Sequence, residues 1–197
     1  MKNQQTQFKK ILAILVIASQ LQGCAAAVGA AAVGGGYLVA YDRRSSGAMM
    51  DDQSVEVKAR HEISKLIEKD EPAHISVISY NNNVLLLGQV QSQGRKRGIE
   101  NAVQNVEKVR HVHNELTVAP PSSASQRAED SWITTKIKSR MVADKELNSN
   151  RVKVVTEDGV VYLLGIVKPD EEEIAANIAR ETKGVRKVVK MFERMAT

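Results

Sequence analysis

Val84-Leu-Leu-Leu-Gly88-Gln-Val90 recurs 77 residues later as Val161-Tyr-Leu-Leu-Gly165-Ile-Val167. The same shift aligns two further pairs of segments: Ile75-Ser-Val77 with Val152-Lys-Val154, and Asn81-Asn82 with Asp158-Gly159. Apolar positions, a glycine and turn-forming residues therefore recur in the same order. We infer that the chain contains two copies of one structural unit. Two copies are too few for a solenoid, which needs at least ~3 repeats.

The matching extends to both sides of these segments with small changes in the shift. Upstream, a shift of 78 pairs Asp52, Val55, Ala59 and Ile63 with Asp130, Ile133, Ile137 and Met141. Downstream, a shift of 76 pairs Val109-Arg-His-Val112 with Val185-Arg-Lys-Val188. The apolar residues Ile133, Ile137 and Met141 stand at i, i+4 and i+8, which predicts a helix with one buried face.

Each copy predicts the element order αββαβ. The β-rich runs are Ile75–Tyr80, Val84–Val90, Val152–Thr156 and Val160–Val167, and the closing strands lie near Arg110–Val118 and Val185–Glu193. Asn81-Asn82 and Asp158-Gly159 suit the positive φ of a tight hairpin turn. The second helices begin near Ser92 and at Pro169, where acids follow and favour the helix dipole. The predicted class is α+β, with two tandem αββαβ modules, each a small mixed three-stranded sheet packed on two helices.

The first 23 residues have the parts of a secretory signal. Lys2, Lys9 and Lys10 precede the apolar run 11–18, which is too short to span ~30 Å of hydrocarbon as a helix. Leu21-Gln22-Gly23-Cys24 contains the only cysteine of the chain and resembles the lipobox at which bacterial lipoproteins are acylated. Because Ala25 follows rather than Asp, the resemblance implies an outer-membrane lipoprotein that faces the periplasm.

The composition of each segment predicts the remaining domain boundaries and excludes a disulfide-stabilised fold. We expect a signal peptide over 1–23, an acylated Cys24 with an Ala/Gly-rich tether over 24–50, modules over 51–118 and 130–197, and a Pro/Ser linker over 119–129. Residues 25–41 suit either a tether or a membrane-embedded helix. A single cysteine excludes a disulfide scaffold. Once the signal is removed, 25 basic and 23 acidic residues remain, so the formal charge of +2 gives little support for nucleic-acid binding.

Two αββαβ copies, each with a V-x-L-x-G-x-V-like strand and a G/K-V-x-x-V segment after the second helix, resemble BON domains. With the lipobox, the chain is similar to dual-BON outer-membrane lipoproteins. That resemblance implies phospholipid binding, support of outer-membrane integrity and no catalytic activity. The first copy lacks a tryptophan at the position that matches Trp132 of the second copy, so the implied lipid site falls on the second copy.

Trp132 is the only tryptophan, and on a helix it lies ~140° from the centre of the buried stripe. An amphipathic indole on a polar helix face suits the boundary between lipid headgroups and acyl chains. The predicted lipid-binding residues share this helix: Trp132, Thr135, Lys136, Lys138, Ser139 and Arg140. The expected partner is anionic, phosphatidylglycerol-like phospholipid. The alternative from the residues alone is that Trp132 packs against the first module or the linker.

A second basic cluster, Arg95-Lys96-Arg97, stands at the start of a helix, where positive charge opposes the dipole. It is either a second anionic-surface contact or a solvated helix end. His111-x-His113 lacks a third ligand, so no metal and no cofactor are expected. No nucleotide loop or nucleophile elbow is present, so no enzyme is expected. The alternative function is a periplasmic scaffold that binds envelope proteins through the same surface or a sheet edge.

Overall fold

The computed structural model describes residues 42–68 and 71–195. The chain from Asp42 onward forms one compact unit. The predicted signal peptide, Cys24 and the segment up to Tyr41 lie outside the described residues. Within the described residues, no helix has the length and apolar character needed to cross a membrane.

The first module follows the predicted order with one difference at its last strand. Its elements are α3 (Ser46–Leu66), β1 (His74–Tyr80), β2 (Asn83–Val90), α4 (Gln93–Gln104), β3 (His111–Asn114) and β4 (Thr117–Val118). Strand β2 pairs with β1 antiparallel and with both β3 and β4 parallel. The sequence predicts one closing strand here, but the structure divides it into two, and Leu116 between them is buried in the core.

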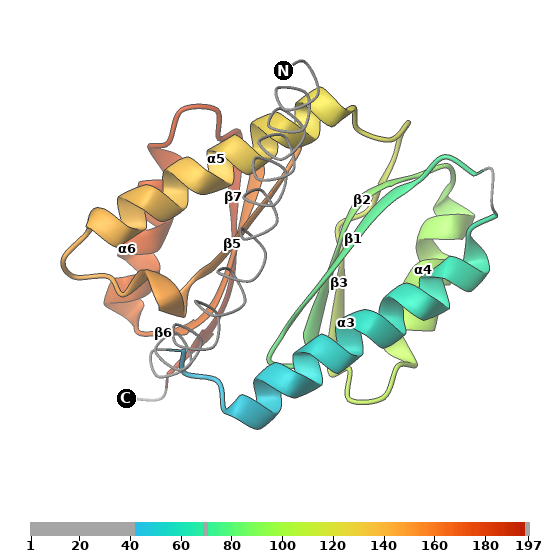
Figure 1. Cartoon of the computed structure of the whole chain (residues 1–197), viewed down its shortest axis with the longest axis horizontal. Helices are drawn as coiled ribbons and strands as arrows, with labels where there is room; N and C mark the ends of the chain where they lie inside the picture. The colour runs from blue at the N-terminus through green and yellow to red at the C-terminus, as the bar shows by residue number, and fades with distance from the viewer. Residues whose placement is uncertain (1–41, 69–70, 196–197) are drawn as a thin grey trace, which may run out of the picture. The chain divides into compact units, whose positions relative to one another are not determined.

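The second module has the predicted three-stranded mixed sheet. Its elements are α5 (Ala124–Ala143), the 3-10 turn η1 (Ser149–Arg151), β5 (Lys153–Glu157), β6 (Val160–Val167), α6 (Pro169–Arg180) and β7 (Lys187–Arg194). Strand β6 pairs antiparallel with β5 and parallel with β7. Helices α5 and α6 cover one face of this sheet, as α3 and α4 cover one face of the first (Figure 1). Both modules therefore have the predicted α+β architecture.

The repeat detected in the sequence marks the buried helix faces residue by residue. The buried residues of α3 are Asp52, Val55, Ala59 and Ile63, and those of α5 are Asp130, Ile133, Ile137 and Met141. The hairpin turns also match the prediction, with positive φ at Asn81-Asn82 and at Asp158-Gly159. The two aspartates lie directly beneath these turns and accept hydrogen bonds from their backbone amides.

The predicted linker is shorter than its composition indicates. Helix α5 begins at Ala124, so only 119–123 connect the two modules outside regular secondary structure. The Ser123 hydroxyl accepts a hydrogen bond from the Gln126 amide, and the Gln126 side-chain oxygen accepts one from the Ser123 amide. This capping box starts the helix inside the Ser-rich stretch. Likewise, α3 begins at Ser46, inside the segment expected to be tether.

A third apolar cluster joins the two sheets on the faces that the helices leave uncovered. Its buried members are Ile78, Tyr80, Leu85, Leu87, Tyr162 and Leu164, which come from both sheets. Polar contacts surround it: Asn81 and Asn83 donate to Glu193, and Gln89 donates to Glu157. The two modules therefore share an apolar interface in addition to their separate cores.

The residues just before α3 contact both modules. Arg43 donates to the carboxylate of Glu171 at 2.5 and 3.0 Å and to the carbonyl of Ile166 at 2.9 Å, both in the second module. Arg44 pairs with Asp52 at 2.8 Å and lies 4.0 Å over the ring of Tyr80, both in the first module. We call Asp42–Arg44 the strap.

Candidate functional site

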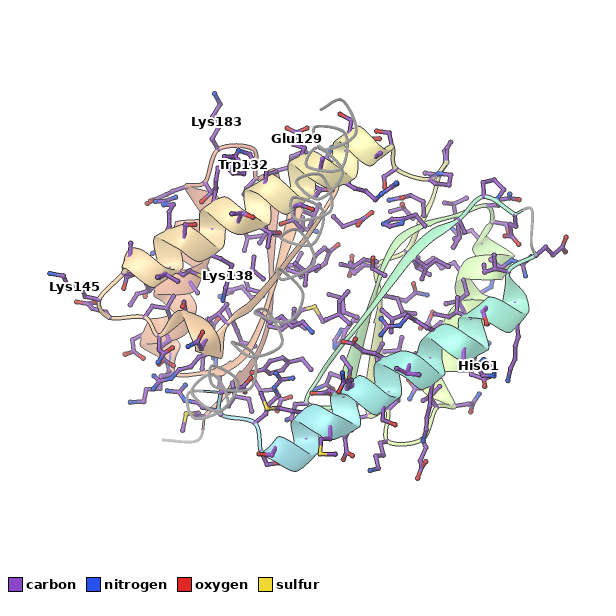
Figure 2. The ribbon with its side chains drawn as sticks, viewed as in Figure 1. His61, Glu129, Trp132, Lys138, Lys145 and Lys183 are labelled. Atoms are coloured by element: carbon purple, nitrogen blue, oxygen red, sulfur yellow. The ribbon has the colours of Figure 1, made fainter. Side chains whose placement is uncertain are left out.

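Trp132 lies on the outer face of α5, away from the sheet (Figure 2). The residue is 62% exposed, while its neighbour Ile133 is buried in the core of the second module. Thr135 and Ser139, which share this face, are also exposed. The structure therefore puts Trp132 on a solvent-facing helix surface, as its spacing from the buried stripe predicts. We call Trp132, Thr135 and Ser139 the α5 outer face.

The three basic residues predicted beside Trp132 have different surroundings. Lys136 donates to the carbonyl of Lys183 at 2.7 Å in an exposed position. Arg140 is exposed and pairs with Glu181 at 2.9 Å. Its guanidinium also donates to the carbonyl of Ile178. Lys136 and Arg140 therefore put positive charge at the edge of the α5 outer face while they bind neighbouring segments of the same module.

Lys138 differs from the other two because its ammonium is directed into the module. It donates to the carbonyls of Ser149 at 2.7 Å and of Val152 at 3.1 Å. Burial lowers the pKa of Lys138. This lysine holds η1 against α5, a role that its place in the sequence does not reveal.

Helix α3 presents a related surface without an aromatic residue. Met50 is 72% exposed and Val57 is 59% exposed, and the repeat aligns them with Ala128 and Thr135 of α5. Ser54 takes the place of Trp132. The exposed tryptophan therefore distinguishes the second module from the first at equivalent helix positions.

The basic cluster at the start of α4 has contacts within its own module. Arg95 pairs with Glu71 at 2.5 Å and donates to the carbonyl of Leu66. Lys96 donates to the carbonyl of Leu116 at 2.6 Å. These contacts explain why two positive charges are retained where they oppose the helix dipole. Arg97 remains exposed.

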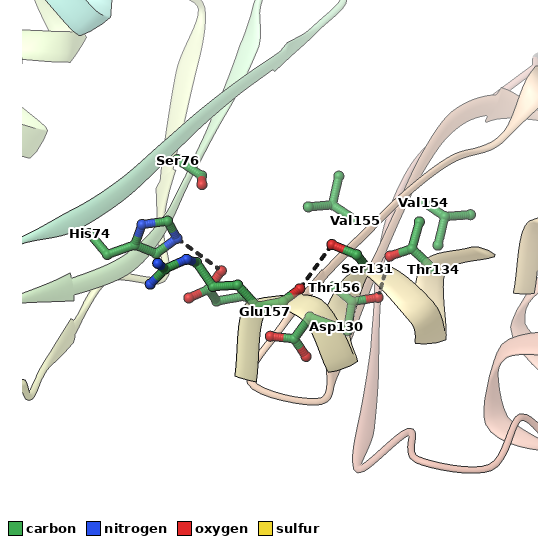
Figure 3. Close-up of a pocket in the computed structure, with 10 residues that line it drawn as sticks. His74, Ser76, Asp130, Ser131, Thr134, Val154, Val155, Thr156 and Glu157 are labelled. Atoms are coloured by element: carbon green, nitrogen blue, oxygen red, sulfur yellow. Dashed lines mark hydrogen bonds and ion pairs between the residues drawn. The ribbon is translucent and has the colours of Figure 1, made fainter. Parts of the chain in front are cut away.

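A groove of about 360 Å³ lies between the modules beside the first half of α5, and both polar and apolar residues line it. His74 and Ser76 of β1 form one wall, opposite residues of α5 and β5 (Figure 3). The second wall carries Arg127, Ser131, Thr134, Thr156 and Glu157 among others. The sequence does not reveal this groove because its walls come from different copies of the repeat.

Several groove residues already interact with one another. His74 Nε2 lies 3.9 Å from a Glu157 carboxylate oxygen, and Thr134 and Thr156 share a hydrogen bond of 2.8 Å. Ser131 donates to the carbonyl of Arg127 at 2.8 Å. Asp130 also lines the groove, but both of its carboxylate oxygens accept from the amides of the β5–β6 turn.

The two histidines singled out in the sequence, His111 and His113, are exposed on β3. Among residues 42–68 and 71–195, no group of three His, Cys, Asp or Glu side chains is arranged to hold a metal ion.

Comparison with known proteins matches the two modules to one family. The model of the BON domain matches residues 51–120 and 129–194. The chain is 39% identical over 188 residues to the outer membrane lipoprotein DolP of Haemophilus influenzae, covering 94% of this chain and 95% of the relative. It is 37% identical to the 21 kDa hemolysin of Actinobacillus pleuropneumoniae, covering 77% and 78%. It is 33% identical to the osmotically-inducible protein Y of Escherichia coli, covering 72% of each.

The two matched segments coincide with the two modules, and the similarity to the first relative extends over almost the whole length of both chains. The chain belongs to the BON-domain family and contains two BON domains in tandem.

Proposed function

We propose that this protein is an outer-membrane lipoprotein, anchored through acylated Cys24 on the periplasmic side, whose second BON domain binds anionic phospholipid and thereby supports outer-membrane integrity. The name of the Haemophilus relative supports the location. The proposal assigns no catalytic activity. The observation that carries the lipid role is the 62% exposure of Trp132 on a helix with basic residues at its edge.

The energy required of this surface is small. Indole rings favour the headgroup region, where the apolar ring and the polar N–H both find partners. Each basic residue near an anionic leaflet adds about 1 kcal/mol. An acylated Cys24 would hold the domain at the bilayer, so a weak contact suffices because the effective concentration is high.

The test uses the mature chain with Cys24→Ser, so that binding depends on the protein surface alone. We expect Trp132→Glu to lower its affinity for phosphatidylglycerol vesicles about tenfold or more, because the variant loses the indole and adds a repelled charge. Vesicle co-sedimentation measures this effect without relying on tryptophan fluorescence.

Val57→Glu is the matched control, since Val57 is equally exposed on α3 and the change in charge is the same. We expect it to retain affinity within about twofold. If both variants lose the same vesicle affinity, the effect comes from net charge alone and the α5 outer face is not the lipid-binding surface. The scaffold function would be favoured instead by two results together. The parent chain would not bind vesicles, and both variants would still bind an envelope protein.

A further inference from the structure

Strands β3 and β7 are edge strands that line one groove between the modules. Within the described residues, β3 pairs only with β2, and β7 pairs only with β6. A groove of about 490 Å³ is lined by residues of both strands, and we call it the β3–β7 groove. A strand with one neighbour leaves a row of backbone amides and carbonyls unpaired along its other side. The groove therefore lies beside strand edges that can pair with a further strand.

The floor of this groove continues the apolar interface between the two sheets. Val189 and Met191 of β7 line the groove and pack against the third apolar cluster, and Leu164 of that cluster lines it as well. Val189 and Met191 are two residues apart on the strand, so both face the first sheet. An apolar side chain inserted here would therefore lengthen an existing interface and remove apolar surface from water.

The opposite wall comes from β3 and is polar. His111 and His113 stand on the same face of this strand and are exposed. Charged residues of both signs also line the groove: Arg110, Lys190, Glu115 and Glu193. Charge alone therefore selects no occupant, and selection falls to the strand edges and the apolar floor.

Strand β7 offers the longer of the two edges. It has eight residues, whereas β3 has four and ends before the buried Leu116. A second copy of this chain is a poor partner for β7. When two β7 strands pair antiparallel over their full length, Lys187 of each copy lies opposite Arg194 of the other, and like charges directly opposite are destabilising. The partner that fits is therefore a different polypeptide.

We propose that the β3–β7 groove binds an extended segment of a partner polypeptide, which pairs with the β7 edge and inserts apolar side chains between the sheets. In this binding mode main-chain hydrogen bonds supply affinity, and the contacts of alternate side chains supply specificity. The segment has apolar residues at alternate positions and no proline where it pairs with β7. Helix α5 packs on the other face of the second sheet, so a bound segment leaves the α5 outer face free. Peptide binding of this kind goes beyond the proposed lipid binding and does not depend on it.

The experiment measures the binding of a synthetic peptide, about as long as β7, to the mature Cys24→Ser chain by fluorescence anisotropy. The peptide alternates valine or phenylalanine with threonine and carries one lysine and one glutamate. Two further peptides are N-methylated, one at every threonine and the other at every apolar residue, so each lacks the amides of one strand edge. A loss of affinity of about tenfold or more in at least one methylated peptide supports pairing with β7. Full retention of affinity by both overturns strand addition.

Variants of the chain locate the site. Val189→Glu places a carboxylate in the apolar floor and should weaken peptide binding about tenfold or more. Val155→Glu is the matched control, because Val155 packs against the same cluster but lines the other groove, beside α5. We expect it to keep peptide affinity within about twofold. His113→Trp leaves the interface residues in place and narrows the groove from its exposed wall, so it should also weaken binding. Thermal unfolding of each variant verifies the fold.

The outcomes separate peptide binding from lipid binding. If the parent chain binds no peptide, or if Val189→Glu and Val155→Glu bind it equally, the groove assignment is overturned while vesicle binding stands. Trp132→Glu should weaken vesicle binding and leave peptide affinity unchanged. A dimer of the parent chain in sedimentation that dissociates in Val189→Glu would assign the groove to a second copy and overturn the assignment to a partner polypeptide.

Discussion

Asp130 holds the turn of the second hairpin through the same pair of hydrogen bonds with which Asp52 holds the turn of the first. Asp130 accepts from the amides of Asp158 and Gly159 at 2.8 Å. Asp52 accepts from the amides of Asn81 and Asn82 at the same distance. In both domains a carboxylate of the first helix therefore fixes the direction of the central hairpin.

We expect Asp130→Ala to lower the free energy of unfolding by about 2–4 kcal/mol, because two amides lose their partner and at least one of them is buried. Asp52→Ala should cost more, because Asp52 also accepts from Ser79 and pairs with Arg44. Urea unfolding measures both. Asp51→Ala removes a more exposed acid and should change the value by less than about 1 kcal/mol; comparable losses in all three variants would contradict the turn-holding role.

Acid should destabilise the protein through Glu171. Burial alone would raise the pKa of this carboxyl, but hydrogen bonds from Arg43, the Lys168 amide and Arg151 outweigh it and lower the pKa to about 2. The ion pairs therefore stabilise the fold above pH 4.5 and are lost as the pH falls from 4.5 towards 2. We expect a loss on the order of 2 kcal/mol in this range.

Urea unfolding across this pH range gives the test, with Arg43→Gln as the variant. Its loss with acid should be smaller, because the pKa of Glu171 then lies closer to the ordinary value. Glu172 titrates in the same range, since hydrogen bonds from Arg194 and Lys190 lower its pKa to about 2. Some acid sensitivity therefore persists in the variant. If the free energy of unfolding falls with pH as steeply in Arg43→Gln as in the parent chain, Arg43 does not lower the pKa of Glu171.

Glycine at the centre of the repeated strand motif allows close backbone contact. A Cβ at Gly165 would overlap the carbonyl oxygen of Arg151, and a Cβ at Gly88 would overlap that of His74. Gly88 also has a φ of 114°. We expect Gly165→Ala and Gly88→Ala each to cost about 2 kcal/mol or more, measured as a lowered midpoint of thermal unfolding.

Gly98→Ala is the internal control for these variants. It lies in α4 with open space around the missing Cβ, so alanine should stabilise the helix by about 0.5–1 kcal/mol. If alanine lowers the midpoint of thermal unfolding by a similar amount at all three positions, close backbone contact is not the cause of the destabilisation.

Lys138→Met should separate stability from lipid binding. The methionine keeps the apolar stem but cannot donate to the carbonyls of Ser149 and Val152, so we expect a loss of about 1 kcal/mol. Phosphatidylglycerol binding should stay within about twofold, because this ammonium faces the module. Lys136→Met, at the edge of the outer face, should weaken vesicle binding by about 1 kcal/mol. Greater loss of binding from Lys138→Met would reverse this division of roles.

The sequence predicts the order of the elements because the two copies of the repeat can be aligned with each other. Equivalent buried positions, such as Ile133 and Val55, stand out against residues that vary between the copies. The Ser/Pro composition of 119–129 predicts a linker there, whereas the capping box of Ser123 and Gln126 starts α5 at Ala124. That signal is local and was available in the sequence.

The interface between the sheets was less predictable. The unbroken apolar runs that contain Leu85-Leu86-Leu87 and Tyr162-Leu163-Leu164 are typical of strands buried on both faces. The helices bury one face of each sheet, and the sheet of the other module buries the second face. The residue pattern within one copy does not specify this partner. For the same reason the groove could not be found, since Ser76 and Ser131 come together only when the two domains pack.

The two adjacent arginines of the strap have a mechanical consequence. Arg43 binds the second domain and Arg44 binds the first, so tension on the chain ahead of Asp42 acts on both domains at the same time. A lipoprotein strained between its anchor and a load in the periplasm would therefore not unravel from α3 alone. The contacts of Arg43 with Glu171 and of Arg44 with Asp52 would have to break before such tension reached α3.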